Sequence, residues 1–201
     1  MLTSTQVIIV LCLATGLLAF SARRLGVLGL ALQVLLRTVL VSQTLLRPVL
    51  YAQLGLGLAA CLILLVAAGS VAHLQRQRRR DAVDPLARMG SLFGIFCVAL
   101  AGFAAAGLQR AFRLPGLPAD ALLTCYWLLL AGMLLAATES SVLGQGLATM
   151  TALNGFEVAF LYMDNGLLMT ALLGLLEIGL ALVIGVLSEH QVQRLNQEEA
   201  G

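Results

Sequence analysis

The sequence predicts an all-α protein, a polytopic transmembrane helix bundle of about seven spans. Of the 201 residues, 60% are hydrophobic and only 11% are charged, and the mean hydropathy is +0.98. A soluble domain cannot bury that much apolar surface, whereas a lipid bilayer accommodates it. The apolar runs are long and continuous rather than alternating in segments of about ten residues, as they do in a membrane β-barrel. The sequence therefore predicts transmembrane helices rather than the strands of a membrane β-barrel.

Seven apolar runs have about the 20 residues that a helix needs to cross the hydrocarbon layer. They lie at 5–22, 25–45, 49–73, 90–109, 119–138, 142–163 and 166–188. Together they form a single transmembrane domain, 1–188, which is followed by a polar cytoplasmic tail, 189–201.

The charge order around the first run favours a retained helix over a cleaved signal. No basic residue precedes 5–22, and Arg23 and Arg24 follow it. A secretory signal has the opposite order, with its basic residues in front. The order also places the N-terminus outside. The second run is the weakest of the seven because it contains four polar residues, Arg37, Ser42, Gln43 and Thr44.

The connections between the later runs are short, with one exception. The segment 74–89 is polar and rich in arginine, which indicates a solvated cytoplasmic loop that touches anionic lipid or, alternatively, a specific lipid site. The segment 113–118 contains two prolines and a glycine, so we expect a tight outside turn. The short turn at 163–166 makes the sixth and seventh helices antiparallel neighbours.

Arginine placement supports an outside N-terminus and a cytoplasmic C-terminus (N-out, C-in). All twelve basic residues are arginine. With seven spans in this orientation, eight of them are cytoplasmic, three are outside and one lies within the membrane. An excess of arginine on the cytoplasmic side is what the positive-inside rule requires.

Several functional classes lack support in the sequence. No basic face with interleaved aromatic residues exists, so nucleic-acid binding is not expected. His73 and His190 flank apolar runs without a second ligand nearby, and no metal site is expected. No nucleophile, metalloprotease or nucleotide-binding motif occurs, so we expect neither a catalytic centre nor a cofactor in this chain. Four cysteines lie singly within apolar runs and are interpreted as small buried hydrophobes: Cys12, Cys61, Cys97 and Cys125.

Five polar residues inside the predicted spans are the candidate functional residues: Arg37, Gln145, Asn154, Glu157 and Glu177. Ionisable groups in hydrocarbon are costly, so they pair, line water or carry protons. At 1.5 Å per residue, Glu177 lies about 16 Å from either end of its span, at the midplane. Glu157 lies about 9 Å below the outer end of its span, and Arg37 has a similar depth.

Equal depth predicts an ion pair between Arg37 and Glu157, which either serves function or only holds helices together. Glu177 is then left without a charged partner. Burial favours its neutral form, so we expect either a proton carrier or a neutral acid hydrogen-bonded to a neighbouring helix. Gln145 and Asn154 are expected to give polar support.

Two C-terminal segments resemble a known family. In 142–160, VLGQGLATMTALNGFEVAF, Gln145 precedes Asn154 and Gly155 by nine residues, and 172–183 reads LLGLLEIGLALV around Glu177. Arg23-Arg24-Leu25 and the run 30–33, LALQ, add to the likeness. The chain resembles the E subunit of hydrogenase-4 and formate-hydrogenlyase-type complexes, a family related to the complex I K subunit and the antiporter C subunit. The resemblance covers the first, second, sixth and seventh runs.

The chain departs from that family at two acidic positions. Where the family usually has Glu-Asn-Gly, this chain has Leu153-Asn154-Gly155, and a second acid appears here as Ala171. Glu157 lies about one helical turn from Leu153 and could substitute for the missing acid in space. These departures leave open whether such a subunit pumps or only scaffolds.

The resemblance implies a non-catalytic integral membrane subunit of a hydrogenase-4 or complex I-like proton-translocating complex. Glu177 and Glu157 would join the proton path, supported by Arg37, Gln145 and Asn154. The implied partners are antiporter-like and other membrane subunits, and the implied location is the cytoplasmic (inner) membrane of a bacterium or archaeon. Two alternatives are a small independent transporter and a purely structural assembly subunit.

Overall fold

The computed structural model describes residues 6, 9–11, 13–15, 23–42, 46–78, 86–164 and 166–198, with the backbone alone at 23–24, 71–78, 86–92, 192 and 195–198. The described part of the chain is helical apart from its short connections. Its helices are α2 (Arg23–Val41), α3 (Arg47–Arg78), α4 (Leu86–Ala111), α5 (Ala119–Thr138), α6 (Val142–Met163) and α7 (Leu167–Glu198).

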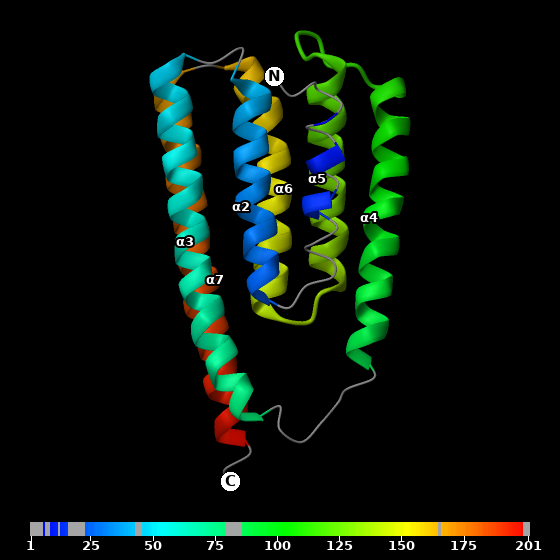
Figure 1. The fold of residues 1–201 in the computed structure, drawn as a ribbon. Helices are drawn as coiled ribbons and strands as arrows, with labels where there is room; N and C mark the ends of the chain where they lie inside the picture. Colours follow the sequence, from blue (N-terminus) through cyan, green and yellow to red (C-terminus); the bar gives the residue numbers. More distant parts are fainter. Residues whose placement is uncertain are drawn as a thin grey trace.

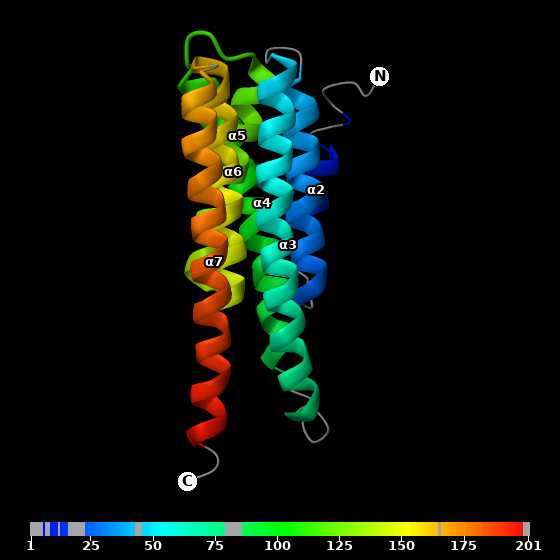
Figure 2. The same ribbon diagram turned by 90° about the vertical axis from the view of Figure 1, so that its left-hand side faces the viewer.

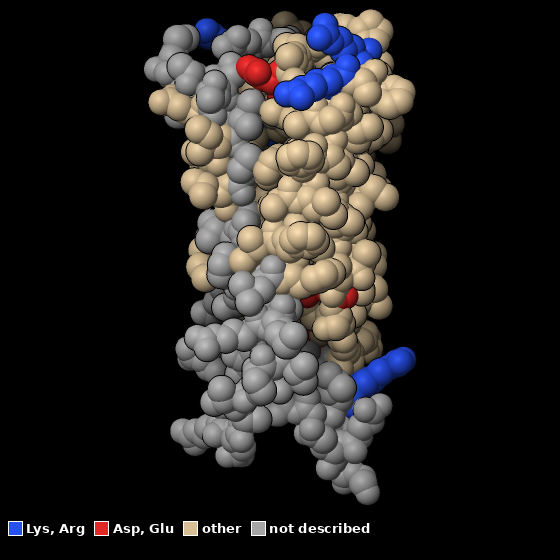
Figure 3. Space-filling view, turned by 90° about the vertical axis from the view of Figure 1, so that its right-hand side faces the viewer, with Lys and Arg blue, Asp and Glu red and all other residues tan. Residues whose placement is uncertain are grey.

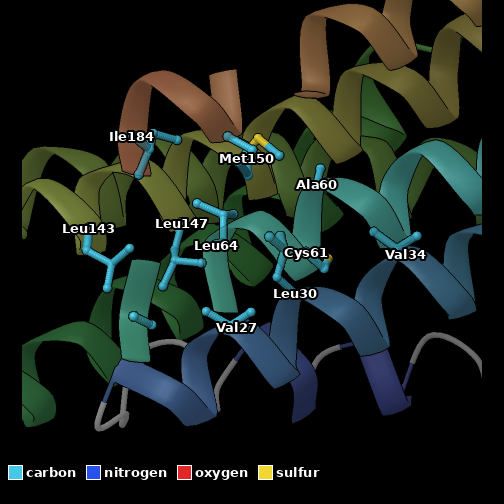
Figure 4. Packing of buried hydrophobic residues seen from close by; sticks show 12 residues of the cluster. Val27, Leu30, Val34, Ala60, Cys61, Leu64, Leu143, Leu147, Met150 and Ile184 are labelled. Atoms are coloured by element: carbon cyan, nitrogen blue, oxygen red, sulfur yellow. The ribbon is translucent and has the colours of Figure 1, made fainter. Parts of the chain in front are cut away.

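The helices run side by side in one elongated bundle (Figures 1 and 2). Helix α2 contacts α3 and α6, and α7 contacts the same two helices, so these four form a closed ring. Helix α5 packs on α6 outside this ring, and α4 packs on α5. The main apolar core lies inside the ring and draws residues from all four of its helices, including Leu30, Leu64, Met150 and Ile184 (Figure 4).

The outer surface of the described helices is largely apolar. Four described helices are long and apolar enough to cross a bilayer, and Leu25–Val41 is a shorter apolar helix. Large apolar side chains point outward, and Phe103 is 85% exposed. On the face shown in Figure 3, the basic side chains of the described residues appear only near the two ends. Lipid is the medium in which such a surface is stable.

The fifth and sixth predicted spans coincide with α5 and α6, and the other predicted bounds differ from the structure. Helix α7 continues to Glu198, ten residues beyond its apolar run, and α3 continues to Arg78. The prediction of a loop at 74–89 is therefore wrong at 74–78 and again from Leu86, where α4 begins. Arginine, glutamine and glutamate are good helix formers in water, so the end of an apolar run does not mark the end of a helix.

The N-terminal half also departs from prediction. Helix α2 ends at Val41, four residues before the predicted end at 45. The Ser42 hydroxyl donates to the Val39 carbonyl at 2.7 Å, and such local bonds compete with helix continuation. Of the predicted span 5–22, residues 6, 9–11 and 13–15 are helical, and the others lie outside the described residues.

The predicted turns at 113–118 and 163–166 are both confirmed as short connections. Between α4 and α5, Gly116 has a φ of +90°, which favours glycine. Between α6 and α7, the Gly166 amide donates to Asp164 Oδ1 at 2.8 Å, and the two helices pack together. Asn165 lies outside the described residues.

Helices α5 and α6 approach each other at two glycines. A Cβ atom on Gly132 would lie 2.4 Å from the Ala152 backbone nitrogen, and one on Gly155 would lie 2.7 Å from the Leu129 nitrogen. Backbone atoms cannot move aside as a flexible side chain can. These glycines therefore allow the close helix contact that small residues provide in membranes.

Gly132→Ala is expected to lower stability by about 1–3 kcal/mol, because the added methyl group forces α5 away from α6. The control is Gly107→Ala on α4, where nothing lies within 4 Å of the added atom. Since alanine favours helix more than glycine does, the control should leave stability unchanged or raise it. Thermal unfolding in detergent measures the stability of the two purified variants. Equal changes in their unfolding temperatures would show that the close approach of α5 to α6 does not limit stability.

Candidate functional site

A cluster of charged and amide side chains is buried where the four ring helices meet. Arg37 comes from α2, Gln53 from α3, Asn154 and Glu157 from α6, and Glu177 from α7. Arg37 is 1% exposed, Glu157 0% and Glu177 2%. We refer to these five residues as the charge cluster.

Arg37 is the centre of the charge cluster. It follows Leu30 and Val34 on the inward face of α2, where residues three and four apart share a side. Its Nη1 donates to Glu157 Oε2, to Asn154 Oδ1 at 2.7 Å and to Glu177 Oε1 at 3.1 Å. One guanidinium nitrogen thus connects α2 with both α6 and α7.

The predicted Arg37–Glu157 ion pair is confirmed. The expectation that Glu177 would then lack a charged partner is wrong, because Arg37 also forms an ion pair with Glu177. Glu157 lies six residues from the end of α6, and Glu177 lies ten residues from the start of α7. At 1.5 Å per residue, the two acids therefore differ in depth along the bundle by about 6 Å. The long side chain of arginine reaches both carboxyl groups across that offset.

Gln53 belongs to the cluster although the sequence analysis did not single it out. Its Nε2 donates to Glu157 Oε2 at 3.0 Å. The sequence contained an indication that Gln53 and Arg37 could meet. Arg37 lies four residues before the end of α2, and Gln53 lies six residues after the start of α3. Consecutive antiparallel helices place such positions at similar depth.

The two predicted polar supports have different surroundings. Asn154 contacts Arg37 across the α2–α6 interface, as expected of an interhelical hydrogen bonder. Gln145 lies at the other end of α6, where it is exposed and its Nε2 donates to the Glu139 carbonyl at 2.9 Å. The structure therefore does not bring Gln145 to the charge cluster.

A second polar contact lies one helical turn from Arg37. Gln33 Nε2 donates to Thr15 Oγ1 at 3.3 Å, and the Thr15 hydroxyl donates to the Leu11 carbonyl at 2.8 Å. Gln33 and Thr15 are both fully buried. Polar groups therefore extend from the charge cluster along α2 toward the N-terminal residues.

The cluster contains more polar atoms than its described contacts satisfy. Within the described part of the chain, six cluster atoms are buried without a hydrogen-bond partner: Arg37 Nε and Nη2, Gln53 Oε1, Asn154 Nδ2, Glu157 Oε1 and Glu177 Oε2. A narrow recess, too tight to admit a water molecule, adjoins Arg37 and Gln53. Unpaired buried groups of this kind are costly and mark sites of function or of bound water.

The cysteines and histidines do not converge on a site in the described residues. Cys61, Cys97 and Cys125 are free and buried, as predicted, and Cys12 lies outside the described part. His190 is exposed. Among the residues that could be searched, no group of three or more histidine, cysteine or acidic residues is arranged to hold a metal ion.

The charge cluster has one cation and two acids in direct contact. Its carboxyl groups can bind and release protons. The five cluster residues include no nucleophile arranged for covalent catalysis. Comparisons with protein-family models, with curated proteins and with solved structures gave no match.

Proposed function

We propose that this chain is a non-catalytic integral membrane subunit of a hydrogenase-4 or complex I-like proton-translocating complex. The observation that carries this proposal is the buried ion-pair cluster of Arg37, Glu157 and Glu177 in the interior of an apolar helix bundle. Intramembrane ionisable residues that face a bundle interior are characteristic of proton and ion pathways. We propose that Glu177 and Glu157 belong to the proton path.

The proposed arrangement has seven spans with the N-terminus outside and the C-terminus in the cytoplasm. Four apolar helices of sufficient length and the shorter Leu25–Val41 support membrane insertion. The distribution of arginine supports the orientation. The proposed site of action is the cytoplasmic membrane of a bacterium or archaeon, where antiporter-like subunits would be its neighbours.

A purely structural role is the second candidate, and the geometry of Arg37 favours it. Contacts from one guanidinium to α6 and α7, together with that from Gln53, tie four helices together. Such a cluster could fix the mutual arrangement of the helices without moving a proton. Function and assembly are separated by variants that remove one acid but keep the ion pair, as argued in the Discussion.

Copurification tests membership of a complex. The full chain, tagged at its C-terminus, is extracted from native membranes in a mild detergent, and its partners are identified by mass spectrometry. We expect antiporter-like and hydrogenase-like subunits in stoichiometric amounts. An unrelated multi-pass protein with the same tag is the control. Recovery of the chain as a lone protein that binds a small solute would instead support the independent transporter.

A further inference from the structure

We propose that Arg37, Glu157 and Glu177 together bind one exchangeable proton, which the two carboxyl groups hold in common. The inference deepens the proposed function and rests on it in one respect, that the cluster lies within the membrane. It does not depend on which complex the chain joins. It specifies how many protons the cluster binds, which is one, and which two carboxyl groups share that proton.

The first argument is charge balance. Both acids contact the same nitrogen of Arg37, so one positive charge faces two carboxyl groups. With both acids ionised, the buried cluster has a net charge of −1. A net charge in a low-dielectric interior is expensive unless it is neutralised. One bound proton makes the cluster neutral.

The surrounding groups provide no second positive charge among the described residues. Helix α3 contributes the uncharged Gln53 and the thiol of Cys61, which is close enough to interact electrostatically with Glu177 and Arg37. Helix α6 contributes Asn154 beside Glu157. A free thiol is neutral at pH 7. The balance therefore depends on the two acids and Arg37.

The second argument is the pattern of unsatisfied atoms. Glu157 Oε1 and Glu177 Oε2 are both buried without a donor, although the partner oxygen of each carboxyl group contacts Arg37. The two carboxyl groups also lie close together, because both contact the same Nη1 atom of Arg37. A proton on either carboxyl group supplies the missing donor and allows a hydrogen bond between the acids.

The binding step is a simple proton transfer. A hydronium ion gives its proton to a carboxylate oxygen, which leaves a water molecule and a neutral acid, and no electron moves. Release is the reverse step. Because Arg37 stays paired with the acid that remains ionised, the cluster stays neutral whichever of the two acids has the proton.

Infrared spectroscopy of the full chain counts protonated acids through the carbonyl stretch of the carboxylic acid. The protein is measured at neutral pH in dodecyl maltoside, which has no ester group to interfere, and the band is identified by its shift on exchange into heavy water. We expect one such band in the unaltered protein. We expect none in Glu157→Gln and none in Glu177→Gln, because each variant leaves one acid paired with Arg37 and a neutral cluster.

Glu157→Gln is the decisive variant. If Glu177 were an independent neutral acid, its band would persist after Glu157 is changed, and the proposal would be overturned. Two bands in the unaltered protein, with one left in each variant, would overturn it as well. Glu189→Gln on the exposed part of α7 is the matched control and should keep the band.

A metal cation is the competing occupant, because Gln53 Oε1 and the two carboxyl oxygens are unpaired oxygen atoms that could ligate one. Spectra are therefore compared in sodium buffer and in buffer whose only cation is a bulky organic ammonium. The proton proposal requires the same band in both. A band that is present only without sodium would assign the site to the metal ion. If the copurification finds no partner subunits, the proposed function fails but the expected band pattern is unchanged. Failure of the proposed function can therefore be told apart from failure of the shared-proton proposal.

Discussion

Arg37→Leu is expected to destabilise the protein by about 3–5 kcal/mol, the cost of removing one partner from a buried ion pair. The change leaves two buried acids facing each other without a cation. It also removes the interhelical contact to Asn154. We therefore expect little folded protein in the membrane and, in the native host, failure of the complex to assemble.

The reason for this large effect is that Arg37 is the only residue that contacts all three polar groups on α6 and α7 in the described cluster. Proton uptake by both acids will offset part of the cost, since neutral acids tolerate burial better than charged ones. Leucine cannot replace the hydrogen bonds that hold the side chains of the three helices in register. Thermal unfolding in detergent and the amount of folded protein in membranes measure the loss.

Arg110→Leu is the matched control, because Arg110 is exposed in the last turn of α4 and the same chemical change is made there. It should alter stability by less than about 1 kcal/mol. The triple variant with leucine at Arg37, Glu157 and Glu177 should recover part of the lost stability, since an apolar cluster contains no unpaired charge. Equal tolerance of Arg37→Leu and Arg110→Leu would contradict a role for the cluster in holding the helices.

The bounds of α5 and α6 could be predicted from sequence because turn residues mark both starts. Pro118 precedes α5, and the Ser141 side chain accepts from the Gly144 amide at 3.1 Å to cap α6. The ends of α3 and α7 could not, because hydropathy reports where lipid ends rather than where a helix ends. Polar residues such as Glu198 continue a helix into water without any change in backbone hydrogen bonding.

The charge cluster was predicted only in part, and the reason is geometric. Depth along a helix follows from sequence, and it correctly paired Arg37 with Glu157, which are 120 residues apart. Which helices adjoin each other does not follow from depth, and the ring of α2, α3, α7 and α6 determines that Gln53 and Glu177 join the same site. Gln145 has the same residue type as Gln53 and lies far from the cluster, so composition could not separate them.

Glu177→Gln is expected to abolish coupled proton translocation while the complex still assembles. Glutamine has nearly the same shape and can still accept from Arg37, so the ion pair between Arg37 and Glu157 remains. The variant cluster is neutral with no proton bound, and an amide does not exchange a proton in this way. The loss is therefore functional and not structural, in contrast to Arg37→Leu.

Proton movement is measured with a pH-sensitive dye in inverted membrane vesicles, driven by the redox reaction of the copurified complex. The redox rate and the amount of assembled complex are measured in the same preparation. Glu189→Gln, on the exposed part of α7, should translocate protons normally. Full translocation in Glu177→Gln would remove this acid from the proton path and leave the cluster as a structural contact. Retained assembly with lost translocation would support a proton-binding role, because Arg37 stays paired with Glu157 and can still donate to the glutamine at 177.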